Sequence, residues 1–248
     1  MLLDGKNALI TGSNRGIGKA ILETFAKEGC KIIWAHARTE SSEFLDLVQT
    51  LSSQYETEIC PIYFDLIDTD NLKREIKEIV RSKQNIDILV NNAGVAHGGL
   101  FQMTPISQIK EIFEINLYAG MEITQLILKK MTRQKSGSIV NLSSISGIDL
   151  KSGNSAYGVS KAAVIAWTKT LAAELGPYNI RVNAVAPGLT DTRMATLMER
   201  EAGEEMVMES ILGRLAKPEE IANVTSYLAS DNASFINGQI IRVDGGRK

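Results

Sequence analysis

The chain has 248 residues, 44% of them hydrophobic and 23% charged, which is enough to bury a full hydrophobic core. Its formal net charge of −2 argues against nucleic acid as a main partner, and the absence of an eighteen-residue apolar run or a signal-peptide pattern argues against a membrane. Because Cys30 and Cys60 lack CxxC spacing, we interpret them as buried free thiols of a cytoplasmic protein.

The N-terminal segment alternates strand, glycine loop, helix and strand. An apolar run at 6–10 stops at Thr11, the loop Gly12–Gly18 follows with GxxxGxG spacing, and a helix-period pattern leads to a second apolar run at 31–35. This order predicts a right-handed βαβ unit. Glycines in this loop would let the backbone and the helix N-terminus approach a pyrophosphate. We therefore predict a dinucleotide site, with a ligand-free glycine turn as the alternative.

The rest of the chain continues the alternation. Helices are predicted at 43–54, 72–81, twice within 105–130, at 156–175 and at 218–229, and strands at 59–64, 87–90, 137–142, 181–185 and 238–243. Seven short strands separated by helices are typical of an α/β fold with a doubly wound parallel sheet. Since no linker or repeat interrupts them, we predict a single domain over residues 1–248.

Polar and glycine-rich segments repeatedly follow the predicted strands. They are Gly12–Gly18, Asp65, Asn92–Gly94, Ser143-Ser144 and Pro187-Gly188. Ligands of doubly wound sheets bind at the carboxyl ends of the strands, which share one edge of the sheet. We therefore expect these segments to converge on one site.

Tyr157 and Lys161 lie four residues apart at the start of a long, Ala-rich helical pattern. Residues at this spacing share a helix face, so the ammonium should favour phenolate and lower the tyrosine pKa. Tyr157 is therefore a candidate general acid near neutral pH. An ordinary surface Tyr/Lys pair is the alternative.

Together these motifs resemble the short-chain dehydrogenase/reductase family along essentially the whole chain. The resemblance rests on Thr11-Gly12-xxx-Gly16-x-Gly18, Asn91-Asn92-Ala93-Gly94, Asn116, Ser144, Tyr157-xxx-Lys161 and Pro187-Gly188. It implies a Rossmann fold. The C-terminal segment, with Gly213-Arg214-Leu215, Pro218–Ala222 and Val243–Gly246, looks most like the 3-oxoacyl-(acyl-carrier-protein) reductase group, although sugar, polyol and steroid reductases share it.

The resemblance assigns a role to each catalytic residue. Tyr157 would protonate the substrate carbonyl oxygen, and Ser144 would hydrogen-bond the same oxygen. Lys161 would bind the nicotinamide ribose and depress the pKa of Tyr157. Asn116 would hold the water that links Lys161 to bulk solvent. The cofactor supplies the hydride chemistry.

The same resemblance implies the cofactor contacts, and no metal. The contacts are Gly12, Ser13, Asn14, Arg15, Gly16, Ile17, Gly18, Arg38, Asp65, Leu66, Asn92, Ala93, Gly94, Tyr157, Lys161, Pro187, Gly188, Leu189, Thr190 and Thr192. Asp65 has a second interpretation as a helix cap. The segment 36–39 has no carboxylate for a ribose 2′-hydroxyl, whereas Arg15 and Arg38 suit a 2′-phosphate. We therefore predict NADP(H), with two merely solvated arginines as the alternative.

By the same resemblance, residues 191–214 are expected to form a substrate lid after Pro187-Gly188. Its candidate apolar lining is Met194, Leu197, Met198, Met206, Met208 and Leu212. Packing between two helices explains these side chains equally well. His97 is expected to be a surface loop histidine, with a place at the substrate mouth as the alternative.

Charge bears on whether an acidic acyl-carrier protein docks. The lid is acidic, with Glu199, Glu201, Glu204, Glu205 and Glu209, which weighs against docking. One basic patch favours it, although a solvated helix end explains these residues as well: Lys129, Lys130, Arg133 and Lys135.

The expected function is NADPH-dependent reduction of a ketone to a secondary alcohol, with a 3-oxoacyl-(acyl-carrier-protein) or similar thioester as substrate. A sugar, polyol or other secondary-alcohol dehydrogenase is the alternative, and a non-catalytic nucleotide sensor is a more remote one, because such proteins typically lose Tyr157 or Lys161. The resemblance also suggests a homotetramer, with Trp167 and Leu171 as interface candidates.

Overall fold

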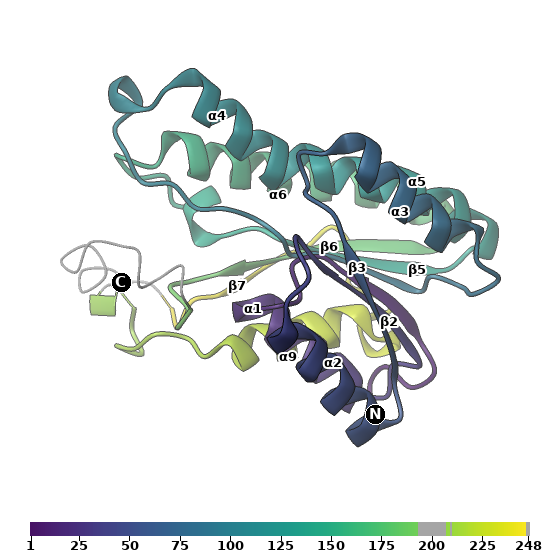
Figure 1. The fold of residues 1–248 in the computed structure, drawn as a ribbon. Helices are drawn as coiled ribbons and strands as arrows, with labels where there is room; N and C mark the ends of the chain where they lie inside the picture. Colours follow the sequence, from purple (N-terminus) through teal and green to yellow (C-terminus); the bar gives the residue numbers. More distant parts are fainter. Residues whose placement is uncertain (193–206, 209, 247–248) are drawn as a thin grey trace.

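A computed structural model describes residues 1–192, 207–208 and 210–246, which build a seven-stranded, all-parallel sheet of order β3-β2-β1-β4-β5-β6-β7 (Figure 1). The strands are β1 (Asn7–Ile10), β2 (Ile32–Ala37), β3 (Glu58–Tyr63), β4 (Ile88–Asn91), β5 (Gly137–Leu142), β6 (Ile180–Pro187) and β7 (Ile240–Val243). The predicted α/β doubly wound Rossmann fold is confirmed. Each predicted strand is present, with ends displaced by two residues or fewer.

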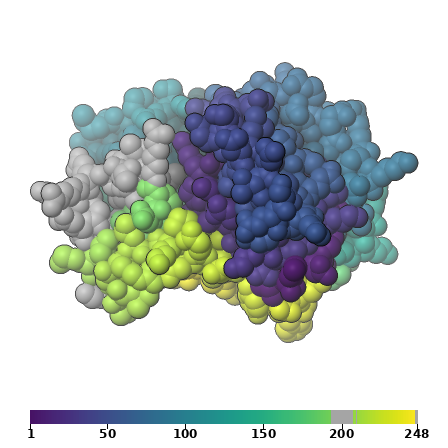
Figure 2. Space-filling view, turned by 60° about the horizontal axis from the view of Figure 1, so that its bottom comes forward, coloured from purple at the N-terminus to yellow at the C-terminus, as the bar shows by residue number. Residues whose placement is uncertain are grey.

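Helices cover both faces of the sheet. On one face lie α1 (Gly16–Lys27), α2 (Ser42–Tyr55) and α9 (Pro218–Ala229); on the other lie α3 (Thr69–Arg81), α4 (Ile106–Phe113), α5 (Ala119–Gln134) and α6 (Ser155–Leu175) (Figure 1). The helices α1 and α9 come from opposite ends of the chain yet pack side by side. Figure 2 shows this meeting of the purple N-terminal segment with the yellow-green segment that contains α9.

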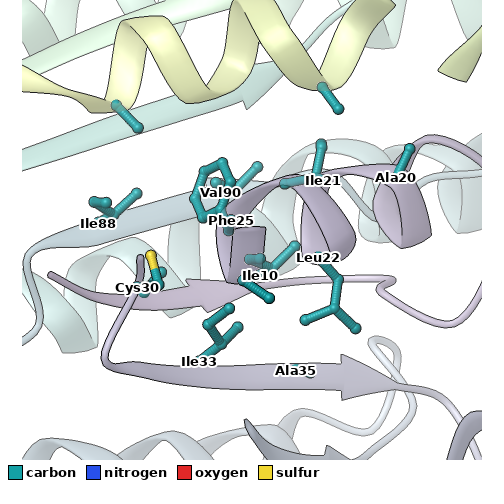
Figure 3. Close-up of a cluster of buried hydrophobic side chains, with 14 of the residues drawn as sticks. Ile10, Ala20, Ile21, Leu22, Phe25, Cys30, Ile33, Ala35, Ile88 and Val90 are labelled. Carbon is teal, nitrogen blue, oxygen red and sulfur yellow. The ribbon is translucent and has the colours of Figure 1, made fainter. Parts of the chain in front are cut away.

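The hydrophobic core is split into two layers by the sheet. Figure 3 shows the layer under α1, where Leu22 and Phe25 lie among Ile10, Ile33 and Val90 of the strands. A second layer lies under α3, α5 and α6. Both sides of a parallel sheet are covered by helices, which is why the central strands read as continuous apolar runs rather than alternating ones.

The two cysteines are free, as predicted, but only Cys30 is buried, and Cys60 on β3 is half-buried. Burial raises the pKa of the Cys30 thiol, which keeps it protonated and chemically inert. Among the described residues, no helix is long and apolar enough to cross a lipid bilayer.

The segment before β5 differs from the prediction. Two helices were expected within 105–130, with Asn116 inside the second. Instead a five-residue π-helix, η2 (Glu114–Tyr118), joins α4 to α5 and carries Asn116. Wider turns of this kind are frequent at functional sites, and helical periodicity does not distinguish them from α-helix.

The neighbouring strands β1 and β4 mark the point where the strand order reverses. The chain leaves β1 towards β2 on one side, and it leaves β4 towards β5 on the other. The two connections therefore run to opposite sides from this point of the sheet, which is where ligands of doubly wound sheets bind.

Candidate active site

The glycine loop between β1 and α1 has the geometry of an anion cradle. Gly12 adopts a positive φ of 70°, and α1 begins after Arg15 without a side-chain cap. An uncapped helix N-terminus leaves backbone N–H groups that suit a pyrophosphate. At Gly18 a Cβ would lie 1.9 Å from the carbonyl oxygen of Gly12, so only glycine fits. The loop therefore fits the dinucleotide that its spacing predicts.

The turn after β4 is fastened to this loop by Thr11. Its hydroxyl oxygen accepts hydrogen bonds from the backbone N–H groups of Asn92 (2.9 Å) and Ala93 (3.0 Å). In return, the Asn92 side chain donates to the carbonyl oxygens of Thr11 (2.8 Å) and Gly12 (3.2 Å). Thr11 belongs to the motif but was not predicted as a site residue; its role emerges only because β1 and β4 are neighbours.

Ser144 is held against α6 by the short loop that follows β5. The Ser143 hydroxyl donates to the Lys161 carbonyl oxygen at 2.9 Å. Gly147, at the end of the 3-10 helix η3 (Ile145–Gly147), lies so close to α6 that a Cβ would come within 2.6 Å of the Lys161 carbonyl carbon. This close approach brings the buried Ser144 into a side-chain hydrogen bond with Tyr157.

Tyr157 and Lys161 do share one face of α6, as the spacing predicts, and the ammonium nitrogen lies 5.9 Å from the centre of the phenol ring. The predicted lowering of the tyrosine pKa is absent from this structure. Burial raises the pKa of Tyr157, and the hydrogen bond with Ser144 only partly opposes that effect. Burial also lowers the pKa of Lys161 to about 8. The same buried environment therefore disfavours both the phenolate of Tyr157 and the ammonium of Lys161.

Asn116 lies beside this pair. Its side chain is bound to the backbone of Val95 in both directions, accepting from N–H at 2.8 Å and donating to the carbonyl oxygen at 2.9 Å. It also donates to the Ser160 hydroxyl at 3.0 Å. A Cβ on Gly94 would be 3.0 Å from Asn116 Oδ1 and 3.3 Å from Lys161 Nζ, so these three residues adjoin. The four predicted catalytic residues therefore form one cluster.

The remaining predicted cofactor contacts also follow strand ends. Asp65 does not cap α3, because Asp68 occupies that place and accepts from the Asn71 N–H at 3.1 Å. The Asp65 carboxylate instead accepts from the N–H of Ile67. Leu66 is buried in the second core layer. The helix-cap interpretation of Asp65 is therefore wrong.

The loop after β6 reaches back to the glycine loop. The Gly188 N–H donates to the Val243 carbonyl oxygen at 2.9 Å, which anchors the loop to β7. At its far end, the Thr192 side chain lies 3.3 Å from the position that a Cβ on Gly16 would occupy. Pro187, Leu189 and Thr190 belong to the same stretch of chain. The segments that follow β1 and β6 thus meet over one site.

Arg15 and Arg38 are both exposed, at the ends of the glycine loop and of β2. Neither guanidinium forms an ion pair within the described part of the chain. Both are therefore available to an anionic ligand.

The predicted lid lies largely outside the described residues. That applies to Met194, Leu197, Met198, Met206 and the glutamates 199, 201, 204, 205 and 209. Of the described members, Met208 and Leu212 are 71% and 62% exposed, so they do not belong to the core. The N–H of Leu212 donates to the carbonyl oxygen of Gly245, which fixes that end of the segment near β7.

His97 is bound within its own loop. One ring nitrogen lies 3.3 Å from the Thr104 hydroxyl, and the other lies 3.1 Å from the Gln108 side-chain nitrogen. These contacts join the β4 loop to the start of α4 and hold His97 half-buried within its own loop. Among the described residues, no group of three His, Cys, Asp or Glu side chains is placed to hold a metal ion.

Comparison with known proteins identifies the family. A family model described as enoyl-(acyl carrier protein) reductase matches residues 12–248. The 3-oxoacyl-[acyl-carrier-protein] reductase FabG of Thermotoga maritima is 40% identical over 246 residues, covering 99% of each chain.

Two solved structures are also similar. A protein assigned as an NAD(P)-dependent gluconate 5-dehydrogenase from Beutenbergia cavernae, with bound NADP, aligns with a TM-score of 0.92 and 30% identity over 98% of this chain and 97% of that one. A 3-oxoacyl-[acyl-carrier protein] reductase from Brucella melitensis, with bound NAD, aligns with a TM-score of 0.89 and 31% identity over 98% and 91%. The chain belongs to the short-chain dehydrogenase/reductase family of oxidoreductases.

Proposed function

We propose that this protein reduces the ketone of a 3-oxoacyl thioester to a secondary alcohol with NADPH. The observation that carries the proposal is the contact of Ser144 with Tyr157 beside Lys161, in a chain 40% identical to the FabG reductase of Thermotoga maritima. The nicotinamide cofactor supplies the hydride chemistry when it is bound. The residues of this chain supply position and protons.

The side chains of Ser144 and Tyr157 bind the substrate carbonyl oxygen. Both hydroxyls can donate to that oxygen, and their mutual hydrogen bond sets their spacing. Since burial raises the pKa of Tyr157, its phenol is protonated at neutral pH and can give its proton to the oxygen. Lys161, whose ammonium lies beside the ring, would stabilise the phenolate that remains and would donate to a ribose hydroxyl of the cofactor.

The cofactor would be held by the glycine loop and the strand ends already described. The uncapped start of α1 would offer its backbone N–H groups to the pyrophosphate, and Arg15 and Arg38 would bind a 2′-phosphate. Since neither guanidinium is engaged in an ion pair by the described residues, both support NADPH over NADH. The two similar structures with bound NADP and bound NAD are the reason to measure the preference in this chain.

The basic patch bears on delivery by an acyl-carrier protein. A groove of about 390 Å3 is lined by Val80, Ser82, Lys83, Lys129, Lys130, Arg133 and Gln134. It adjoins the end of α5, which leads into the amino end of β5, whereas Ser144 follows the carboxyl end of β5. Six residues of strand separate these edges by roughly 20 Å. A carrier bound at the groove would therefore lie at the opposite edge of the sheet from Ser144.

Reduction of a keto-sugar acid is the second candidate, supported by the TM-score of 0.92 to the gluconate 5-dehydrogenase structure. The free thiols Cys30 and Cys60 are consistent with a cytoplasmic setting for either reaction.

The test follows cofactor absorbance with NADPH and NADH in parallel against three substrates. These are acetoacetyl-N-acetylcysteamine, acetoacetyl-acyl-carrier protein and 5-keto-gluconate. Rapid NADPH oxidation with either thioester is expected, and a preference for the carrier-bound form would establish that partner. Turnover of 5-keto-gluconate with neither thioester active would replace the proposal by the second candidate. Binding of cofactor with no turnover across a broad ketone panel would point to a nucleotide sensor.

A further inference from the structure

His36 is a buried histidine on β2 whose two ring nitrogens both have backbone partners. It is 2% exposed. The N–H of Gly12 donates to Nδ1 at 3.2 Å, and Nε2 lies 2.9 Å from the carbonyl oxygen of Phe64. The imidazole also stacks on the Phe64 ring, with centroids 4.0 Å apart. The ring therefore bridges the glycine loop after β1 to the residue that follows β3.

These partners define the protonation state of the ring. An amide N–H can only donate and a carbonyl oxygen can only accept, so Nδ1 must carry the lone pair and Nε2 the hydrogen. His36 is therefore the neutral Nε2–H tautomer. Burial lowers its pKa to about 4, although the Phe64 hydrogen bond and the nearby charge of Asp65 act in the opposite direction. The ring is neutral across the pH range in which the enzyme would operate.

The position of His36 connects three segments that would meet the adenosine half of the cofactor. Besides the ring contact with Gly12, its backbone carbonyl oxygen accepts from the Ser13 N–H at 2.7 Å. Arg38 lies two residues further along the chain, and Asp65 directly follows Phe64. The glycine loop, the 2′-phosphate residue and the adenine-side residue are thus set relative to one another through one side chain.

We propose that His36 is a positioning residue for the dinucleotide, acting by holding the Gly12 amide in place. The inference rests on nicotinamide dinucleotide binding, not on the identity of the ketone. None of the contacts described for the ring involves Ser144 or Tyr157. Its removal should therefore weaken cofactor binding without slowing the chemical step. If His36 had only a structural role, its replacement would lower stability without a selective loss of cofactor binding.

Two substitutions test the hydrogen bonds of the two ring nitrogens separately. In His36→Asn, the amide oxygen lies near the place of Nδ1 and can still accept from Gly12, but nothing reaches Phe64. In His36→Gln, the longer amide can donate to Phe64 near the place of Nε2, but the Gly12 N–H loses its acceptor. Each variant therefore loses one hydrogen bond and keeps the other, which makes them matched controls.

The experiment measures NADPH dissociation constants by cofactor fluorescence, together with kcat at saturating NADPH and melting temperature. The dissociation constant is expected to rise about fivefold or more in His36→Gln and to stay within about twofold in His36→Asn, because one hydrogen bond of average strength is at stake. The kcat at saturating cofactor should be near wild type in both. Equal binding by the two variants, or a loss confined to kcat, would overturn the proposal.

A second measurement needs no variant. Nitrogen-15 NMR of the histidine side chains should show His36 with protonated Nε2 and unprotonated Nδ1, and this state should persist when NADPH binds. A protonated Nδ1 would refute the bridge to Gly12 even if neither variant folded. Neither the binding measurement nor the NMR measurement uses a ketone, so both remain interpretable if the proposed substrate is wrong. Failure of the wild-type protein to bind either nicotinamide dinucleotide would refute both proposals.

Discussion

Lys161 directs its ammonium to the carbonyl oxygen of Leu142, at 2.8 Å, while lying over the face of Tyr157 rather than bonding to its hydroxyl. The phenol oxygen is instead engaged by Ser144. The lysine is thereby held at the end of β5, next to Asn116 and Gly94, where a cofactor ribose would approach. Burial dominates the pKa of Tyr157, and the hydrogen bond with Ser144 is the effect that opposes it.

Replacement of Tyr157 by Phe should abolish most of the turnover while leaving the fold intact. The ring is retained, but the proton donor is lost, so kcat should fall by about 10²- to 10⁴-fold. Cofactor affinity measured by fluorescence should fall far less than kcat, because Lys161 and the glycine loop are unchanged. Tyr178→Phe, on an exposed tyrosine just past the end of α6, is the control and should behave as wild type. Turnover near wild type in folded Tyr157→Phe would exclude Tyr157 as the acid.

Cofactor affinity should weaken as the pH rises through 8. Burial places the pKa of Lys161 at about 8, so the side chain is charged below that pH and increasingly neutral above it. A charged donor binds a ribose hydroxyl more strongly than a neutral amine. The NADPH dissociation constant should therefore increase several-fold between pH 7 and pH 9. In Lys161→Met the affinity should be weak and nearly independent of pH over this range; the same pH dependence in that variant would assign the titration to another group.

Adding a methyl group at Gly18 should disrupt the glycine loop. A Cβ there would lie 1.9 Å from the Gly12 carbonyl oxygen, so the backbone of the loop must move. We expect Gly18→Ala to lower the melting temperature and to reduce NADPH affinity by about tenfold or more, since the cradle for the pyrophosphate is displaced. Gly98 is the matched control, because a Cβ added to it would meet no atom within 4 Å. Equal cofactor affinity in Gly18→Ala and Gly98→Ala would contradict the cradle.

Substitution of Arg38 by Asp should move the cofactor preference towards NADH. A carboxylate repels a 2′-phosphate and can accept a hydrogen bond from a ribose 2′-hydroxyl. Loss of a charged hydrogen bond should weaken NADPH binding by about tenfold or more. NADH affinity, measured in the same variant, is the internal control and should stay unchanged or increase. Unchanged selectivity would mean that Arg38 is simply solvated.

The chain should form a homotetramer through the helices near the site. Leu171, one predicted interface residue, lies in the second core layer and is 7% exposed, so it cannot contribute, and Trp167 packs partly against the same layer. Val159 on α6 is 47% exposed and is the better candidate. Light scattering should report four times the 27.1-kDa chain mass. Val159→Lys should reduce that mass.

A matched lysine substitution provides the control for assembly. Leu45→Lys changes a residue of similar exposure on α2, across the sheet from α6, and should leave the tetramer intact. A monomeric wild-type protein would overturn the prediction outright.

Local spacing of residues was enough to predict the glycine loop and the order of strands and helices along the chain. It also placed Tyr157 and Lys161 on one helix face, since i and i+4 positions always share a face. The π-helix at Asn116 was not predictable, because its residues keep the apolar periodicity of an ordinary helix.

How these parts affect one another depends on which segments become neighbours in the folded chain. Thr11 binds the turn at Asn92 because β1 lies beside β4. His36 contacts the segments after both β1 and β3 because β2 lies between these two strands. The direction of the Tyr157 pKa shift was decided in the same way. The neighbouring ammonium is visible in the sequence, but desolvation depends on everything packed around the phenol. Here desolvation raises the Tyr157 pKa and outweighs the opposing hydrogen bond with Ser144.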